Sequence, residues 1–170
     1  MNFKIVTDVA GINRGLFCAT HGLYILTSAL DDKLNGQCLD SLMQVTNMPP
    51  RMAIGVGKKT FTHELIMKSG VFAANVIDLE DERRYDTVKH FGFQSGRKVD
   101  KFASYEYELG ELGVPILPAA KAFFEGQVIH DRILDLETHT LFVADVVRVG
   151  ERESGEPLTY NQYRKDRKKN

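Results

Sequence analysis

Five apolar runs rich in β-branched and aromatic residues most constrain what this chain can fold into. They cover residues 22–30, 51–58, 70–77, 121–134 and 139–151. The last run, HTLFVADVVRVGE, has the strongest β character, because valine and phenylalanine dominate it. The run at 121–134 alternates in part between apolar and polar residues, as a half-buried strand does. The chain is therefore expected to be mainly β.

Helical signals are fewer and shorter. Residues 62–69 have Thr62 as a possible N-cap and Gly70 just beyond their end, and residues 79–92 end in a cationic turn and glycine. Residues 39–46 suit one short helical turn. Because helices and strands do not alternate as they do in a βαβ protein, the pattern predicts an antiparallel β-barrel carrying a few short helices.

Size and charge narrow the class of protein. The chain has 170 residues, which predicts a single domain over 1–170, and its net charge of −1 argues against nucleic acid as a partner. No run reaches the roughly 18 apolar residues of a membrane helix, and the first 15 residues lack the apolar centre of a signal peptide. The basic tail, 163–170, is expected to be a flexible, solvated end.

Cysteine and histidine spacing predicts neither a disulfide framework nor a metal site. Cys18 and Cys38 form no CxxC pair, and the five histidines show no HxH or HExxH pattern. A reducing cytoplasm is the expected location.

The segment GVGKKT, Gly55 to Thr60, combines a strand end with two lysines and the start of a helix. It lacks the glycine spacing of a phosphate loop. Its ammonium groups, the hydroxyls of Thr60 and Thr62, and free helix N–H groups could still hold a phosphate. The alternative is a solvated turn that caps the helix.

A second candidate feature is a polar edge that could bind a flat heteroaromatic ring. Such a ring needs donors and acceptors along its edge and apolar walls above and below. The polar candidates are Thr27, Ser28, Asn35, Gln37, Asp40 and Ser41, and the wall candidates are Leu39, Leu42, Met43 and Val45. The alternative is a loop whose side chains satisfy its own backbone.

Two further features have both a functional and a structural interpretation. Residues 90–102 mix aromatic rings with Arg97, Lys98 and Lys101, and could either cover a ligand or form an irregular surface loop. His139, at the start of the last long run, could lie beside a redox centre or be a simply packed histidine.

The order of these blocks resembles the flavin reductase-like family of FMN-binding split barrels. The blocks that carry the resemblance are GLYILTS, NGQCLDSLMQVTNMPP, IGVGKKTFTHELIMKSGVFAANVI, FGFQSGRKVDKF, GVPIL, ETHTLFVADVV and PLTYNQYR. The resemblance is nearest to the branch that contains archaeal ferric reductase, flavoredoxin and the flavin domain of high-molecular-weight rubredoxins. It implies an antiparallel Greek-key split β-barrel with a few helices, assembled as a homodimer with FMN near the interface.

The resemblance also implies roles for individual residues. It places the isoalloxazine ring against Thr27, Ser28, Cys38, Leu39, Asp40, Ser41, Gln44, Val45 and Thr46. It places the phosphate end at Lys58, Lys59, Thr60 and Thr62, and brings Phe93, Ser95, Arg97 and Tyr160 toward the cofactor. His139 matches a histidine that lies near the flavin and the nicotinamide, and is the candidate catalytic residue. The family often has Ala-Asn-Ser/Thr where this chain has Leu39-Asp40-Ser41, and an aspartate there is expected to lower the flavin potential.

The implied activity is an FMN-dependent NAD(P)H oxidoreductase. Hydride would pass from the nicotinamide to bound FMN, and electrons would go on to a ferric complex, free flavin or a rubredoxin-like partner. One alternative is a flavoredoxin-type electron-transfer protein without productive nicotinamide binding. Another is a non-redox binding module on the same barrel.

Overall fold

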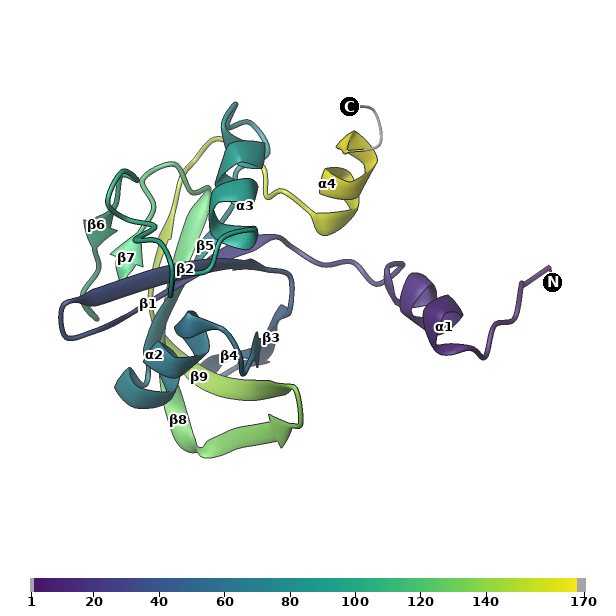
Figure 1. Ribbon diagram of the computed structural model, residues 1–170, viewed down its shortest axis with the longest axis horizontal. Coiled ribbons are helices and arrows are strands. Elements are labelled where there is room, and N and C mark those ends of the chain that lie inside the picture. The colour runs from purple at the N-terminus through teal and green to yellow at the C-terminus, as the bar shows by residue number, and fades with distance from the viewer. Residues whose placement is uncertain (1, 168–170) are drawn as a thin grey trace.

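The computed structural model describes residues 2–167, and its main feature is one antiparallel sheet of seven strands in the order β2-β1-β5-β8-β9-β4-β3 (Figure 1). These strands are β1 (Tyr24–Leu30), β2 (Lys33–Leu39), β3 (Leu42–Asn47), β4 (Pro50–Gly57), β5 (Val71–Val76), β8 (Ala122–Leu136) and β9 (His139–Glu151). After β4 the chain crosses through a helix to β5, which pairs with β1, a connection of the Greek-key kind. The mainly β, antiparallel prediction is confirmed.

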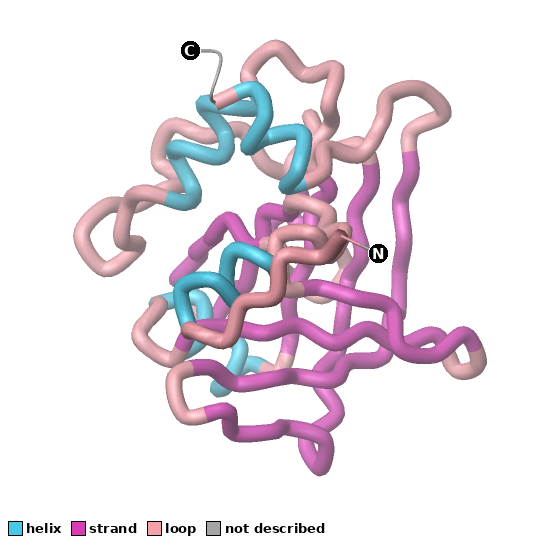
Figure 2. Tube along the Cα trace, turned by 90° about the vertical axis from the view of Figure 1, so that its right-hand side faces the viewer, coloured by secondary structure: helices cyan, strands magenta, loops and turns pink. Residues whose placement is uncertain are grey.

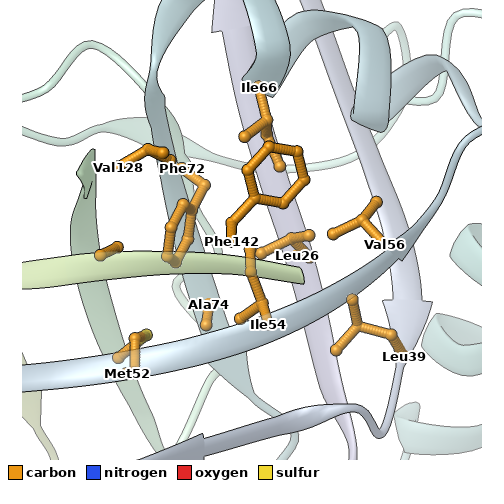
Figure 3. Packing of buried hydrophobic residues seen from close by; sticks show 11 residues of the cluster. Leu26, Leu39, Met52, Ile54, Val56, Ile66, Phe72, Ala74, Val128 and Phe142 are labelled. Atoms are coloured by element: carbon orange, nitrogen blue, oxygen red, sulfur yellow. The ribbon is translucent and has the colours of Figure 1, made fainter. Parts of the chain in front are cut away.

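The barrel core is formed by apolar side chains that the strands turn inward (Figure 3). Leu39 of β2, the first strand in the order, and Ile54 of β4, the last but one, belong to the same buried cluster as Phe72 and Phe142. The sheet is therefore wrapped around this cluster. Phe72, Ile54 and Phe142 have no exposed surface, so their burial provides much of the stabilisation of the barrel.

Two of the four helices among residues 2–167 pack against the barrel. They are α2 (Phe61–Ser69) and α3 (Arg84–Gly92), and both contact β2. The N-cap of α2 is Thr60, whose side chain accepts a hydrogen bond from the His63 N–H at 3.2 Å. Its C-cap is Gly70, with φ of 72°. Thr60, not Thr62, is thus the N-cap, because the helix begins two residues earlier than a cap at Thr62 would place it.

A second apolar cluster lies outside the barrel core, under α3 and α4 (Tyr160–Asp166). Phe91 of α3 and Tyr163 of α4 are both buried in it. The expectation of a solvated tail from residue 163 is therefore wrong for its first part, because Tyr163 anchors a helical turn. The last residues of that tail, 168–170, lie outside the described part of the chain.

The segment between residues 33 and 47 differs most from expectation. Residues 33–39 form β2, which pairs with β1 from Leu30↔Lys33 to Tyr24↔Leu39, where the sequence indicated a polar turn. Residues 42–47 form β3, paired with β4, so the predicted helical turn at 39–46 is wrong. Pairing with a neighbouring strand decided the conformation here over local preference.

The β8–β9 hairpin is the longest element and turns at Glu137, which has φ of 61°. Its register places His139 beside Gly57, the last residue of β4. The start of β9 and the end of β4 therefore meet at one rim of the barrel. A small second sheet pairs β6 (Glu108–Leu109) with β7 (Pro115–Ile116).

The first helix, α1 (Val9–Leu16), lies on an arm that extends away from the sheet (Figure 1). In the view of Figure 2 the helices gather to one side of the strands. The guanidinium of Arg164 lies 3.8 Å from the ring centre of Phe17, which joins the base of the arm to α4. Among the described helices, none combines the length and apolar character needed to span a membrane.

Candidate functional site

A cleft of about 500 Å³ lies along the free side of edge strand β2. Four separate segments form it: the end of β2 with the residues after it, the corner between β4 and α2, the loop after α3, and His139. Within residues 2–167, β2 pairs only with β1, so its other edge has no strand partner. The lining residues include Asn35, Gln37, Cys38, Leu39, Asp40, Ser41, Gly55, Gly57, Lys59, Thr60, Phe61, Phe93, Gln94, Ser95, Lys101 and His139.

The corner between β4 and α2 forms the cationic end of the cleft. Thr60 is the N-cap of α2, and its hydroxyl also donates to the Gly57 carbonyl at 2.9 Å. Lys58 is drawn away by a 2.6 Å ion pair with Asp135, whereas Lys59 is exposed and lines the cleft. The corner therefore presents one available ammonium group and the positive end of a nine-residue helix.

The floor of the cleft is held by hydrogen bonds between the β2–β3 connection and β4. The Ser41 hydroxyl donates to the Gly55 carbonyl at 2.7 Å, and the Gly55 N–H donates to the Ser41 carbonyl at 2.8 Å. A Cβ at Gly55 would come within 3.3 Å of the Ser41 side chain. Glycine thus keeps the backbone of β4 close to the cleft without displacing Ser41.

Cys38 lines the cleft as a neutral thiol. Burial, with the negative charge of Asp40 as a smaller cause, raises the pKa of Cys38 to about 12. A thiol that stays protonated at neutral pH is a poor nucleophile and a poor metal ligand. Cys38 therefore contributes packing and polarity to the cleft.

The loop after α3 covers the cleft from the other side. Phe93 is 66% exposed, and its ring forms an apolar wall. Ser95 accepts from the Arg97 N–H at 3.3 Å, which shapes the turn. His139 stands at the opposite rim, exposed, with Nδ1 2.9 Å from the Thr138 hydroxyl.

The structure brings half of the sequence-predicted residues to this cleft. They are Cys38, Leu39, Asp40, Ser41, Lys59, Thr60, Phe93, Ser95 and His139. They come from positions as far apart as 38 and 139, and only the fold brings them together.

The remaining predicted residues lie elsewhere in the chain. Thr27 and Ser28 are fully buried and donate to backbone carbonyls, and Thr62 is buried and accepts from the Asn35 amide at 2.8 Å. Arg97 forms a 2.8 Å ion pair with Glu64 beside an adjoining groove. The others outside the cleft are Gln44, Val45 and Thr46 on the outer side of β3, Lys58 in its ion pair, and Tyr160 in α4.

Several lining residues were not singled out as site residues from the sequence. Lys101 is the main one, because it is only 2% exposed although it stands in a polar loop segment. Gln37 was recognised only as part of a polar edge. A lysine preceding a phenylalanine carries no local sign of burial, so only the tertiary structure could have identified it.

Comparisons with known proteins identify the family of this chain. A model of the flavin reductase like domain matches residues 16–168. The chain is 36% identical over 151 residues to a high molecular weight rubredoxin of Moorella thermoacetica, covering 88% of this chain but 64% of that protein. It is 34% identical over 145 residues to a ferric-chelate reductase (NAD(P)H) of Archaeoglobus fulgidus, covering 85% of this chain and 83% of that protein.

A solved structure extends the likeness to the fold. The NADH:FAD oxidoreductase of Streptomyces globisporus superposes with a TM-score of 0.83, covers 92% of each chain and is 23% identical. The family model and two relatives above 30% identity span nearly the same residues as the barrel and its cleft. The chain therefore belongs to the family of flavin reductase like domains.

Proposed function

We propose that this protein is an FMN-dependent NAD(P)H oxidoreductase. The observation that carries the proposal is the cleft of about 500 Å³ with a cationic helix start at one end, in a chain of the flavin reductase family. The relative from Archaeoglobus fulgidus is named as a reductase that uses NAD(P)H. A cleft of this size is typical of small-molecule sites.

The residues present fit a flavin mononucleotide. Lys59, the Thr60 hydroxyl and the free N–H groups of the first turn of α2 suit the phosphate. The edge of β2 offers polar groups to the rim of a flat ring, and Phe93 offers an apolar wall. When bound, FMN supplies the capacity to take up hydride and pass on electrons, and the protein binds and orients it.

We propose that His139 acts on the nicotinamide. Its imidazole is exposed at the rim of the cleft, opposite the loop after α3. A hydrogen-bonding group there can hold a nicotinamide in position and keep water away from its reacting carbon. We assign this positioning role to His139.

A second copy of the chain accounts for the predicted residues on β3. Gln44, Val45 and Thr46 lie on an exposed edge strand, outside the cleft of their own chain. In a homodimer these side chains would reach the flavin of the partner.

The two free cysteines suit a reducing cytoplasm.

The electron acceptor is proposed as a class. A relative named as a ferric-chelate reductase favours a ferric complex, and one named as a high molecular weight rubredoxin favours a rubredoxin-like partner. The second name is also the observation behind the second candidate function, a flavoredoxin-type electron-transfer protein. The two candidates differ in whether NAD(P)H reduces the bound flavin.

An anaerobic titration tests the proposal. Purified protein loaded with FMN is mixed with NADH or NADPH, and the flavin absorbance is followed. Rapid bleaching supports the oxidoreductase, and a His139→Ala variant should keep its FMN and bleach more slowly. Bound FMN that neither nicotinamide reduces would favour the electron-transfer protein. Failure of FMN to bind would remove both redox functions.

A further inference from the structure

Lys101 is a buried cation that lines the cleft. It is 2% exposed, and its ammonium donates to the carbonyls of Gly36 at 2.7 Å and Phe91 at 2.8 Å. No carboxylate pairs with it among residues 2–167. An ammonium has three N–H donors, so one is left without a protein acceptor.

Burial of this charge has a measurable signature. Loss of water lowers the pKa of Lys101 to about 8, which leaves the side chain mostly protonated at neutral pH. A buried cation without a carboxylate costs free energy. Its two carbonyl acceptors join β2 to the end of α3, so the positive charge is fixed in place beside the cleft.

Gln37 presents the complementary feature next to it. Its carboxamide oxygen is buried and accepts no hydrogen bond from residues 2–167, although Gln37 lines the cleft. A buried acceptor without a donor is unusual and unfavourable. Gln37 follows Gly36, whose carbonyl holds the Lys101 ammonium, so the orphaned acceptor and the fixed cation lie at the same stretch of edge strand β2.

An acceptor beside a cation matches one side of a flavin. The pyrimidine side of an isoalloxazine ring has an imide N–H between two carbonyls, and this ring gains negative charge when it is reduced. The other charged or titratable groups that line the cleft are Cys38, Asp40, Lys59 and His139. Lys59 belongs to the phosphate corner. The negative charge of the Asp40 carboxylate acts on the reduced ring in the opposite sense to the positive charge of Lys101.

We propose that Gln37 and Lys101 recognise the imide edge of the flavin. The Gln37 oxygen accepts from the imide N–H, and the Lys101 ammonium favours the reduced ring over the oxidised ring. This inference rests on the proposed FMN site and assigns the orientation of the ring within it. It makes Gln37 a binding residue and Lys101 a residue that tunes the reduction potential.

The first arm of the experiment measures the reduction potential of bound FMN in Lys101→Met and wild-type protein. Affinity for reduced FMN should fall about tenfold more than affinity for oxidised FMN, which lowers the two-electron potential by about 30 mV. Lys98→Met, which removes an exposed cation three residues away, is the matched control and should leave the potential unchanged. A purely structural role for Lys101 predicts weaker binding of both redox forms and no change in potential.

The second arm uses FMN methylated at the imide nitrogen. Wild-type protein should bind FMN about tenfold more tightly than this analogue, and Gln37→Leu should bring the two affinities close together. An unchanged ratio in Gln37→Leu, or an unchanged potential in Lys101→Met, overturns the inference while FMN binding itself stands. If wild-type protein binds no FMN, the proposed function is what fails. Should Lys101→Met not fold, the Gln37→Leu ratio decides alone.

Discussion

Lys101 carries a charge that folding must remove from water, and this has a consequence for stability. Its pKa falls from 10.5, the ordinary value, to about 8 in the folded protein, chiefly through burial. Between these two values the unfolded chain binds more protons than the folded one. The free energy of unfolding therefore rises with pH across this window.

We predict that wild-type protein gains up to about 3 kcal/mol between pH 8 and pH 10.5 relative to Lys101→Met. Chemical denaturation of the apo proteins at several pH values measures the difference. Groups that do not interact with Lys101 titrate alike in both proteins, and a Cys38→Ser background removes the coupled thiol from the comparison. If the free energies of unfolding of the two proteins change with pH in parallel, burial does not lower the pKa of Lys101.

For single residues, the sequence is enough to identify those whose role depends on their neighbours in the chain. Thr60 and Lys59 could be identified because a lysine and a threonine before a helix form a recognisable pattern. Lys101 and the unpaired oxygen of Gln37 could not, because their significance depends on strands and loops distant in the chain. Likewise, nothing local shows that Thr27 and Ser28 hydroxyls serve buried carbonyls.

Among the elements, the corner before α2 combines two separable tasks. Thr60 caps the helix through the His63 N–H, whereas Lys59 makes no ion pair among the described residues and lines the cleft. The cap contributes to stability whether or not a ligand is present. The Lys59 ammonium contributes only when an anion is bound.

We therefore predict different outcomes for two substitutions at this corner. Thr60→Ala should lower the stability of apo protein by about 1 kcal/mol and also weaken FMN binding. Lys59→Ala should leave apo stability unchanged and cost about 1.5–3 kcal/mol in FMN binding. Thermal unfolding and a flavin fluorescence titration measure the two effects, with Thr60→Ser as the control that keeps the cap. Unchanged FMN affinity in Lys59→Ala would move the phosphate elsewhere.

Whole elements were predictable where the hydrophobic pattern was strong. The five β runs correspond to β1, β4, β5, β8 and β9, because their side chains fill the barrel core. β2 and β3 were missed because their polar residues suit an edge position, where pairing on one side is enough. α1 and α4 were missed because they are short, with eight and seven residues.

For the whole molecule, the outer side of β3 and β9 suggests how two copies meet. Val45 of β3 is 43% exposed and Val147 of β9 is 49% exposed. In the sheet, β4 lies between these two strands. β3 is an edge strand of the sheet, and exposed apolar side chains on and near such a strand favour association. We propose that this surface is the interface of a homodimer.

Val45→Glu should then separate the two copies. Burying an unpaired carboxylate costs about 3 kcal/mol, which corresponds to a rise of about a hundredfold in the dissociation constant of the dimer. Val99→Glu, at a valine 39% exposed in a loop, is the control and should remain dimeric. Sedimentation equilibrium measures both, and a wild-type protein that sediments as a monomer would contradict this assignment.

The cleft takes its lining from residues between Asn35 and His139, and unfolding scatters them. A nucleotide that occupies the cleft binds only the folded chain, so its concentration shifts the folding equilibrium. The heat resistance of this protein would accordingly follow the vitamin supply of the cell. A shortage of riboflavin would shorten the lifetime of the folded protein before it lowered the rate of the reaction.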